Sequence, residues 1–531
     1  MSERSSFYRK IVYGVVIIAL LFPIAWLSMP ATATKAGGKL AQIRSDPSHP
    51  FSQSSLGDVD PASETMKLAT LGLRGVAVNL LWEKANHYKK VEDWTNLTAT
   101  LEQLAKLQPN FITFWKFQAW NLTYNVSVEF DDYHDRYYYV RRGIDFLKQG
   151  ERYNKDNPHL LWDLGWFLGQ KIGRADEHVQ YRRLFKADDD FHGEERRGDD
   201  RDNWLVAKEW YQTGIDAVDK KGRSIDRKSP RIFYSSPAMS QMNYAEAIEE
   251  EGFFDKARRA WIKAQEEWEA FGQLSIEHST GVPLKLGDQP RLEAEVARLQ
   301  AELDALAPGV RDKLLAEKRE KLTPEERAAL DTPPEKRTES QMHLAYETMG
   351  KLEVTDREVA QQIVKEHPEL EKQALLLVGD LERAKVRLRF TVNYKADSNY
   401  DYWLTRAQLE QTPDALGARE DMFKARRAFR EGDLLTAQKL YEDGFAKWRR
   451  VFDAFPMAIE SESSTGDDLI QYIVQYRDVL DQLDEQLDEN FQLWDVIERF
   501  DSEQKLLEEV TAHQRRTGQL PPESDSTPAA E

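Results

Sequence analysis

Residues 244–257, YAEAIEEEGFFDKA, carry the pattern that decides the fold of this chain. Apolar and small residues recur at the three- and four-residue spacing of a helix on both sides of Gly252. A glycine there can adopt the positive φ that a turn between two helices often requires. Phe254 is then placed to pack back on the pair, and Ala257 to lie where the two helices cross closely. The stretch therefore predicts a helix–turn–helix unit.

The same pattern occurs at other places in the chain. A second copy surrounds Gly432, where small and apolar residues have offsets like those around Gly252: Ala425, Leu434, Ala437, Tyr441 and Gly444. A looser copy closes at Pro109, and an advance of roughly 34 residues maps its Leu81 onto Trp115. Self-similarity at a fixed period of this size is typical of repeat architectures.

Together these units resemble the tetratricopeptide repeat (TPR), a helical hairpin that stacks with its neighbours into a solenoid. Residues 114–130, FWKFQAWNLTYNVSVEF, are also similar to a group of uncharacterised bacterial membrane-anchored TPR proteins. The spacing departs from the family after Trp115, because the next closing proline, Pro158, lies 49 residues beyond Pro109. The resemblance implies an all-α fold, a TPR-like helical-hairpin solenoid in two halves, and no convincing strand pattern accompanies it.

The resemblance also implies a function, because TPR proteins generally hold a protein or peptide on the concave face lined by the first helix of each pair. Transferred by offset, the partner-binding candidates are Asn79, Trp82, Asn86, Lys89, Lys90, Lys116, Trp120, Tyr124, Arg426 and Arg430. The same offsets give further candidates, including positions in the unit near Gly252: Thr113, Thr123, Met242, Glu246, Glu249, Glu250, Arg419, Met422 and Phe429. The alternatives are a plain core role for the tryptophans and a solvated surface for the asparagines and lysines. We expect a protein–protein interaction scaffold, not an enzyme, that needs no cofactor.

The N-terminus has the pattern of a membrane anchor. Residues 11–28, IVYGVVIIALLFPIAWLS, contain no charge, and as a helix of about 27 Å they would nearly cross a ~30 Å hydrocarbon core. A cleaved signal peptide ending near residues 31–33 is the alternative. Arg4, Arg9 and Lys10 precede the stretch and favour a cytoplasmic N-terminus. These features predict a single-pass protein of the cytoplasmic (inner) membrane with the bulk of the chain extracytoplasmic.

Composition shifts divide the chain into six expected segments. Residues 1–29 form the cytoplasmic tip and transmembrane anchor, 30–63 a flexible tether, and 64–290 an aromatic-rich TPR-like domain. Residues 291–340 form a helical arm and linker, in which Thr323 and Glu326 have capping-box spacing. Residues 341–512 form a second helical domain, and 513–531 a disordered tail. An apolar stripe from Leu469 to Ile497 predicts that the second domain ends in a long capping helix.

Composition excludes several classes of function. Lys and Arg number 73 against 92 Asp and Glu, and the net charge of −19 disfavours binding to nucleic acid. The absence of cysteine excludes disulfides and thiolate metal sites. The sequence contains no glycine-rich phosphate loop and no zinc-protease or nucleophile-elbow motif.

Two charged stretches leave alternatives open. Asp131, Asp132, His134 and Asp135, with Glu129 beside them, could hold a hard divalent cation, or these carboxylates could serve a hydrolase. Their spacing is not that of a calcium loop, so a solvated acidic loop is the favoured interpretation, as it is for residues 188–195. The basic residues 220–228, KKGRSIDRK, are interpreted as a solvated loop, with a contact to acidic segments as the alternative. A divalent-cation or small-ligand binding protein is therefore the second functional hypothesis.

Overall fold

The structure is a computed structural model that describes residues 74–277, 280–460, 464–517 and 519–520, together with isolated residues between 12 and 42. The chain divides into two compact units. Unit 1 comprises Met1–Ser229 and Met239–Tyr244, and unit 2 comprises Pro230–Ala238 and Ala245–Glu531. Both units are almost entirely helical, which confirms the predicted all-α class. The six expected segment boundaries stay predictions.

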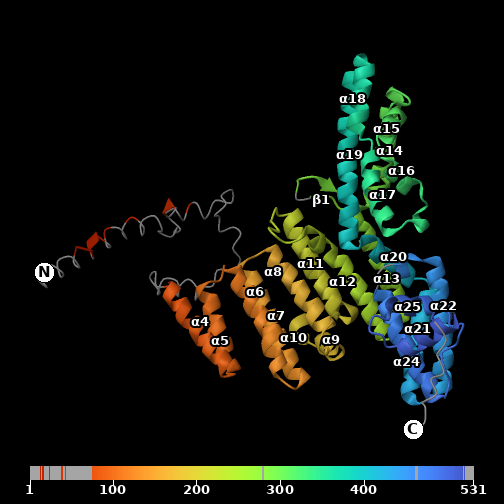
Figure 1. The fold of residues 1–531 in the computed structure, drawn as a ribbon. Helices are drawn as coiled ribbons and strands as arrows, with labels where there is room; N and C mark the ends of the chain where they lie inside the picture. Colours follow the sequence, from red (N-terminus) through yellow and green to blue (C-terminus); the bar gives the residue numbers. More distant parts are fainter. Residues whose placement is uncertain are drawn as a thin grey trace, which may run out of the picture. The chain divides into compact units, whose positions relative to one another are not determined.

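Unit 1 is a succession of helices that pack against their neighbours in the chain (Figure 1). In order they are α4 (Arg74–Lys90), α5 (Trp94–Leu107), α6 (Ile112–Trp120), the π-helix η2 (Asn121–Val126), η3 (Ser127–Glu129), α7 (Tyr133–Tyr153), α8 (Pro158–Trp166), the π-helix η4 (Phe167–Lys171), α9 (His178–Lys186), α10 (Asp189–His192), η5 (Gly198–Arg201) and α11 (Asn203–Asp219). Side-chain caps fix where several of them begin, because Asp93, Asp132, Asn157 and Asp202 each accept a hydrogen bond from a backbone N–H of the first turn.

Close approaches between these helices depend on small residues facing large rings. Trp115 of α6 is fully buried and lies against Gly150 of α7, where an added Cβ would be 2.7 Å from the Trp115 ring. Tyr211 of α11 lies against Gly165 of α8, where a Cβ would be 2.6 Å from the Tyr211 ring. The core of unit 1 is therefore built from interlocking aromatic and aliphatic side chains.

The helix α12 (Pro230–Glu250) supplies residues to both units, and unit 2 continues from it to the C-terminus. Its next elements are α13 (Phe254–Gln273), β1 (Ile276–Glu277), β2 (Pro283–Leu284), η6 (Leu286–Asp288), α14 (Gln289–Leu306), α15 (Val310–Glu320), α16 (Pro324–Asp331), η7 (Pro334–Lys336), α17 (Glu339–Leu352), α18 (Asp356–Glu366), η8 (Pro368–Leu370) and α19 (Glu371–Ser398). They are followed by α20 (Tyr400–Glu410), α21 (Pro413–Glu431), α22 (Leu434–Ala454), α23 (Met457–Glu460), α24 (Ser464–Gln482), α25 (Trp494–Phe500) and α26 (Leu507–Arg516). The two short strands pair antiparallel, with Ile276 opposite Leu284, so the expectation of no strand holds except for this hairpin.

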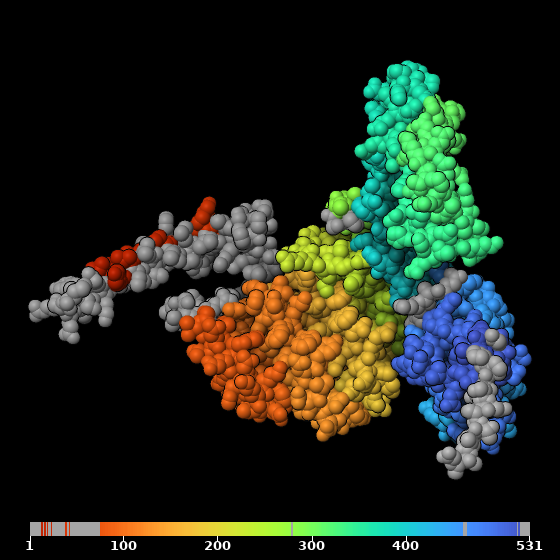
Figure 2. All heavy atoms as spheres, in the orientation of Figure 1, coloured from red at the N-terminus to blue at the C-terminus, as the bar shows by residue number. Residues whose placement is uncertain are grey.

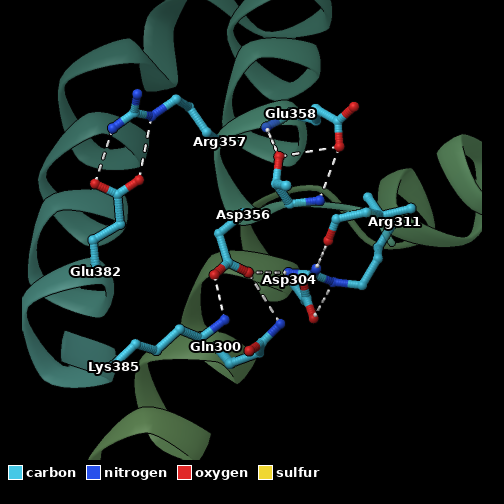
Figure 3. A network of polar contacts seen from close by, with 10 residues as sticks. Gln300, Asp304, Arg311, Asp356, Arg357, Glu358, Glu382 and Lys385 are labelled. Carbon is cyan, nitrogen blue, oxygen red and sulfur yellow. Dashed lines mark hydrogen bonds and ion pairs between the residues drawn. The ribbon is translucent and has the colours of Figure 1, made fainter. Parts of the chain in front are cut away.

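The helices α14 and α15, from the arm and linker expected at 291–340, pack with α18 and α19 around a small apolar core. In the space-filling view these elements are the green to teal atoms (Figure 2). A polar network lies beside this core (Figure 3). The buried carboxylate of Asp356 accepts hydrogen bonds from Arg311 (3.0 Å), Gln300 (3.2 Å) and Lys385. The predicted cap at Thr323 is confirmed, because Glu326 N donates to its hydroxyl (3.2 Å) and Thr323 N donates to the Glu326 carboxylate (2.8 Å).

The predicted long C-terminal helix is wrong. The helix α24 ends at Gln482, and Asp484 adopts a left-handed backbone (φ 57°) in the turn that follows. The polar residues after that turn break the helix, while the apolar stripe continues into α25, so that Trp494 and Ile497 still enter the core shared with α21, α22 and α24. Hydrophobic periodicity predicted the burial of these residues but not the break in the backbone.

The predicted membrane anchor needs correction as well. Within the described part of the chain, no helix combines the length and the apolar character needed to cross a bilayer. This finding contradicts the expected single-pass localisation in the cytoplasmic membrane. Most of residues 11–28, from which that localisation was predicted, and most of the expected tether at 30–63 lie outside the described residues. Of the expected tail at 513–531, the first residues belong to α26.

Candidate binding face

A run of aromatic rings, four of them exposed and two half-buried, crosses unit 1 from α4 through α6 and η2 to α8. Its members, called here the aromatic face, are Trp82, Phe117, Trp120, Tyr124, Trp162 and Trp166. The ring centroids of the first four are separated by successive steps of 6.2, 6.3 and 6.2 Å. Trp162 and Trp166 stack on each other with centroids 5.3 Å apart. The rings are thus close enough to form one surface across three helices that are separated in the sequence.

Tyr124 and Trp162 are half-buried and pack against the core, whereas the other four rings are exposed. Solvent reaches 36% of Trp82, 48% of Phe117, 44% of Trp120 and 39% of Trp166. The alternative that Trp82 and Trp120 are plain core residues is therefore disfavoured. Contiguous exposed apolar surface of this kind marks interaction sites on soluble proteins.

The local backbone places these rings on one side. Phe117, Trp120 and Tyr124 follow each other at spacings of three and four residues, which brings them to one face of a helix. Directly after Trp120 the helix widens into the π-helix η2, and directly after Trp166 it widens into η4. Wide turns of this type are rare and occur frequently at functional sites.

At the α4 end, Trp82 forms the wall between two hollows. One has a volume of about 270 Å³ and is lined by residues of α4, α5 and α6 and the loop between the last two: Val78, Asn79, Trp82, Leu104, Gln108, Phe111 and Phe114. The smaller one measures about 90 Å³ and is lined by Trp82, Ala85, Asn86, Lys89, Leu97, Leu101, Phe117, Gln118 and Asn121. Lys89 Nζ donates to Asn121 Oδ1 (3.0 Å) across this hollow. The structure thus brings together four of the predicted residues, Asn79, Trp82, Asn86 and Lys89.

At the α8 end, the aromatic face meets a buried carboxylate with two lysines. Asp163 pairs with Lys116 Nζ (3.0 Å) and with Lys228 Nζ (3.7 Å). The Lys228 ammonium also lies 3.1 Å from the centroid of the Trp162 ring, which attracts it through the ring quadrupole. Burial lowers the pKa of Lys228 to about 8, and Asp163 opposes this shift. Lys228 is therefore folded onto α8 and does not belong to a fully solvated loop.

The remaining predicted partner residues are spread over both units. Tyr124 belongs to the aromatic face, and burial raises the pKa of its hydroxyl to about 12, with the neighbouring Trp166 acting in the opposite direction. Lys90 is exposed at the end of α4 and lines neither hollow. Arg426 and Arg430 lie in unit 2, where they line a separate cavity on α21.

The acidic stretch has a structural role in the described chain. Asp132 begins α7 as its cap, since its Oδ1 accepts from His134 N (2.7 Å) and contacts His134 Nδ1 (3.0 Å). Asp131 and Asp135 are exposed. Across the described ranges, no three His, Asp or Glu side chains are grouped so that they could hold a metal ion. The structure thus places these residues at the start of α7.

Three residues of the aromatic face were missed by the sequence analysis: Phe117, Trp162 and Trp166. Lys228 belongs to the basic stretch 220–228, and its pairing with Asp163 agrees with the alternative interpretation of that stretch, a contact to acidic groups. Phe117 had a detectable signal, because it lies three residues before Trp120. The 49-residue gap between Pro109 and Pro158 disrupts the repeat offsets, so the tryptophans of α8 could not be aligned with Trp82 or Trp120. The chain matches no protein-family model, and no curated protein matches it by sequence.

Proposed function

We propose that unit 1 is a short TPR-like solenoid that acts as a protein-interaction scaffold, and that it binds an extended partner segment along the aromatic face. The single observation that carries the proposal is the row of aromatic rings from α4 to α8, of which Trp82, Phe117, Trp120 and Trp166 are exposed. Large rigid rings are the side chains that dominate binding energy at protein interfaces. Binding, without chemistry on the partner, is the activity that this surface supports.

The spacing of the rings supports an extended partner. Side chains on one face of an extended chain repeat every second residue, which corresponds to about 6.4–6.8 Å. The three centroid steps between Trp82, Phe117, Trp120 and Tyr124 are 6.2–6.3 Å. Alternate side chains of a bound segment could therefore each lie against one ring.

The polar groups beside the rings support a peptide over a purely apolar ligand. The side-chain amides of Asn79 and Asn86 make no hydrogen bond to the residues that the structure describes. Each amide offers both a donor and an acceptor, as a peptide backbone requires. The rings can bind the side chains of a peptide, and the neighbouring amides can bind its backbone. This combination suits a peptide segment.

A random peptide library selected against the full chain tests this proposal. Enriched peptides should carry apolar side chains at alternate positions, and fluorescence anisotropy should show binding that Trp82→Ala and Trp120→Ala each weaken by about 30-fold or more, the effect of losing roughly 2 kcal/mol at an interface hot spot. Tyr346→Ala is the matched control, because Tyr346 is 80% exposed on α17 of unit 2. Circular dichroism should show unchanged helicity for all three variants. Peptides that bind equally well to the tryptophan variants would remove the aromatic face as the binding surface.

A further inference from the structure

A cavity in unit 2 combines an apolar wall with two cationic side chains. It has a volume of about 370 Å³ and is lined by Glu250, Phe423, Arg426, Phe429, Arg430 and Gln475. Four of these residues belong to α21, where positions 423, 426 and 430 fall on one helical face. Gln475 comes from α24, and Glu250 from the last turn of α12. The cavity is thus lined by three helices of unit 2, and its volume is at the low end of the size range of small-ligand pockets.

The two arginines lack carboxylate partners among the described residues, unlike most of their neighbours. Arg449 and Arg450, on the adjacent α22, pair with Asp495 (2.9 Å) and Asp414 (2.6 Å). Arg426 instead lies over the Tyr472 ring at 5.6 Å, and Arg430 donates only to a backbone oxygen, that of Arg426 (3.3 Å). Each guanidinium carries five N–H donors, so both have donors left to offer.

The other groups of the cavity are held in place. Phe423 packs against Phe254 with centroids 5.8 Å apart, and an added Cβ on Gly252 would lie 2.9 Å from the Phe423 ring. Gln475 Oε1 accepts from the Tyr441 hydroxyl (3.0 Å), which leaves the amide N–H groups of Gln475 as donors. Two arginines against the single carboxylate of Glu250 leave the lining with a net positive charge in a chain whose overall charge is −19.

From these observations we infer that the cavity binds a small organic carboxylate whose apolar part is aromatic or branched aliphatic. The carboxylate would be held between Arg426 and Arg430, because a planar guanidinium matches a carboxylate with two parallel hydrogen bonds. The apolar part would lie against Phe423 and Phe429, and the Gln475 amide would donate to a remaining ligand oxygen. This site is independent of the aromatic face and of the function proposed for it.

The test uses the full chain and a pair of nearly isosteric probes, 3-phenylpropionate and 3-phenylpropanamide. Isothermal titration calorimetry should give a dissociation constant on the order of 1 mM or lower for the carboxylate, since about 4 kcal/mol is attainable for a ligand of this size. The neutral amide should bind at least about tenfold more weakly, because it cannot form the charge-assisted pair. Equal affinities for the two probes would overturn the inference.

Two variants locate the binding. Arg426→Gln combined with Arg430→Gln should weaken 3-phenylpropionate by about tenfold or more, while Arg427→Gln should leave it unchanged, because Arg427 is exposed on the same helix and does not line the cavity. Helicity measured by circular dichroism should be the same for all variants. Unaltered affinity in the double variant would show that the acid binds elsewhere and would overturn the assignment. If acetyl-Glu-Phe-Glu-amide displaced 3-phenylpropionate and bound more tightly, the cavity would serve protein side chains and the small-acid inference would fall.

Discussion

The aromatic face of unit 1 and the hairpin around α21 in unit 2 use the same kinds of side chain in opposite ways. In unit 1 the rings of Trp82, Phe117 and Trp120 face solvent. In unit 2 the rings of Trp448 and Tyr441 are fully buried. Burial of a ring stabilises the fold, while exposure leaves its apolar surface free to bind. The two regions thus share helix–turn–helix units but differ in whether their aromatic rings face solvent. This difference decides what each region can bind.

The two regions also differ in how deeply they bury their charged side chains. Unit 2 buries Arg406, Glu410 and Arg419, with Glu249 beside them. Arg419 contacts both oxygens of the Glu410 carboxylate and stands over the Trp448 ring at 5.0 Å. The α8 end of the aromatic face buries only Asp163 with partly exposed lysines. A buried, interlocked charge cluster fixes the geometry of a core, whereas a partly exposed one can still be reached by a partner.

The largest expected effect is on the buried cluster. Arg419→Ala removes the main partner of Glu410 and leaves a buried carboxylate short of positive charge, so we expect a loss of about 3–5 kcal/mol in the free energy of unfolding. Urea denaturation of the full chain, followed by circular dichroism, measures this loss as an earlier transition. Arg427→Ala, on the same helix and 4.0 Å from Glu431, should change stability by less than about 0.5 kcal/mol. Equal effects of the two changes would mean that the cluster does not hold unit 2 together.

Sequence periodicity could predict the helices and much of the aromatic face, but not the charge cluster. Trp82, Trp120 and Tyr124 follow from offsets within local repeats, which one sequence contains. Arg406 and Glu410 lie four residues apart on α20, a spacing that the sequence does contain. Arg419 of α21 and Asp468 of α24 join them only through the packing of three helices, which no local spacing signals. The break of α24 at Gln482 was missed for a related reason, since the apolar stripe continues across a turn that only the backbone reveals. Local signals thus specify which residues are buried, whereas tertiary packing decides which residues they contact.

A smaller loss of stability is expected where the core of unit 1 has no room for an added methyl group. Gly150→Ala places a methyl group 2.7 Å from the buried Trp115 ring, and we expect the overpacking to cost about 1–3 kcal/mol. Gly350→Ala is the matched control in α17, where nothing lies within 4 Å of the added Cβ. That change should stabilise its helix by about 0.5–1 kcal/mol. Thermal denaturation should therefore shift in opposite directions for the two variants, and a stabilising Gly150→Ala would contradict the packing described for α6 and α7.

The smallest expected effect is on how the free energy of unfolding depends on pH. The sign of this dependence should differ between Glu249 of unit 2 and Lys228 of unit 1. Burial raises the pKa of Glu249 well above its ordinary 4.5, and the nearby Glu410 adds to the shift. Its contribution to stability is fully present below pH 4.5 and is lost as the pH rises through the raised pKa, because the folded state holds this proton more tightly than the unfolded chain. Glu249→Gln keeps a neutral side chain that can still accept from Trp261, whose Nε1 donates to Glu249 at 2.8 Å, and should flatten this dependence in unit 2.

Lys228 should behave in the opposite way, since its pKa is lowered from 10.5 to about 8. Its folded state releases the proton more readily than the unfolded chain, so its contribution to stability is fully present above pH 10.5 and declines as the pH falls towards 8. Lys228→Met retains an apolar chain against Trp162 without the charge, and urea denaturation between pH 7 and 10.5 should then lose the rise in stability that the parent chain shows. Because Lys228 remains partly exposed, solvent screening keeps this difference small. A parent chain whose stability falls steadily over that interval, and a variant that falls with it, would mean that Lys228 is solvated and that the α8 end of the aromatic face does not hold it.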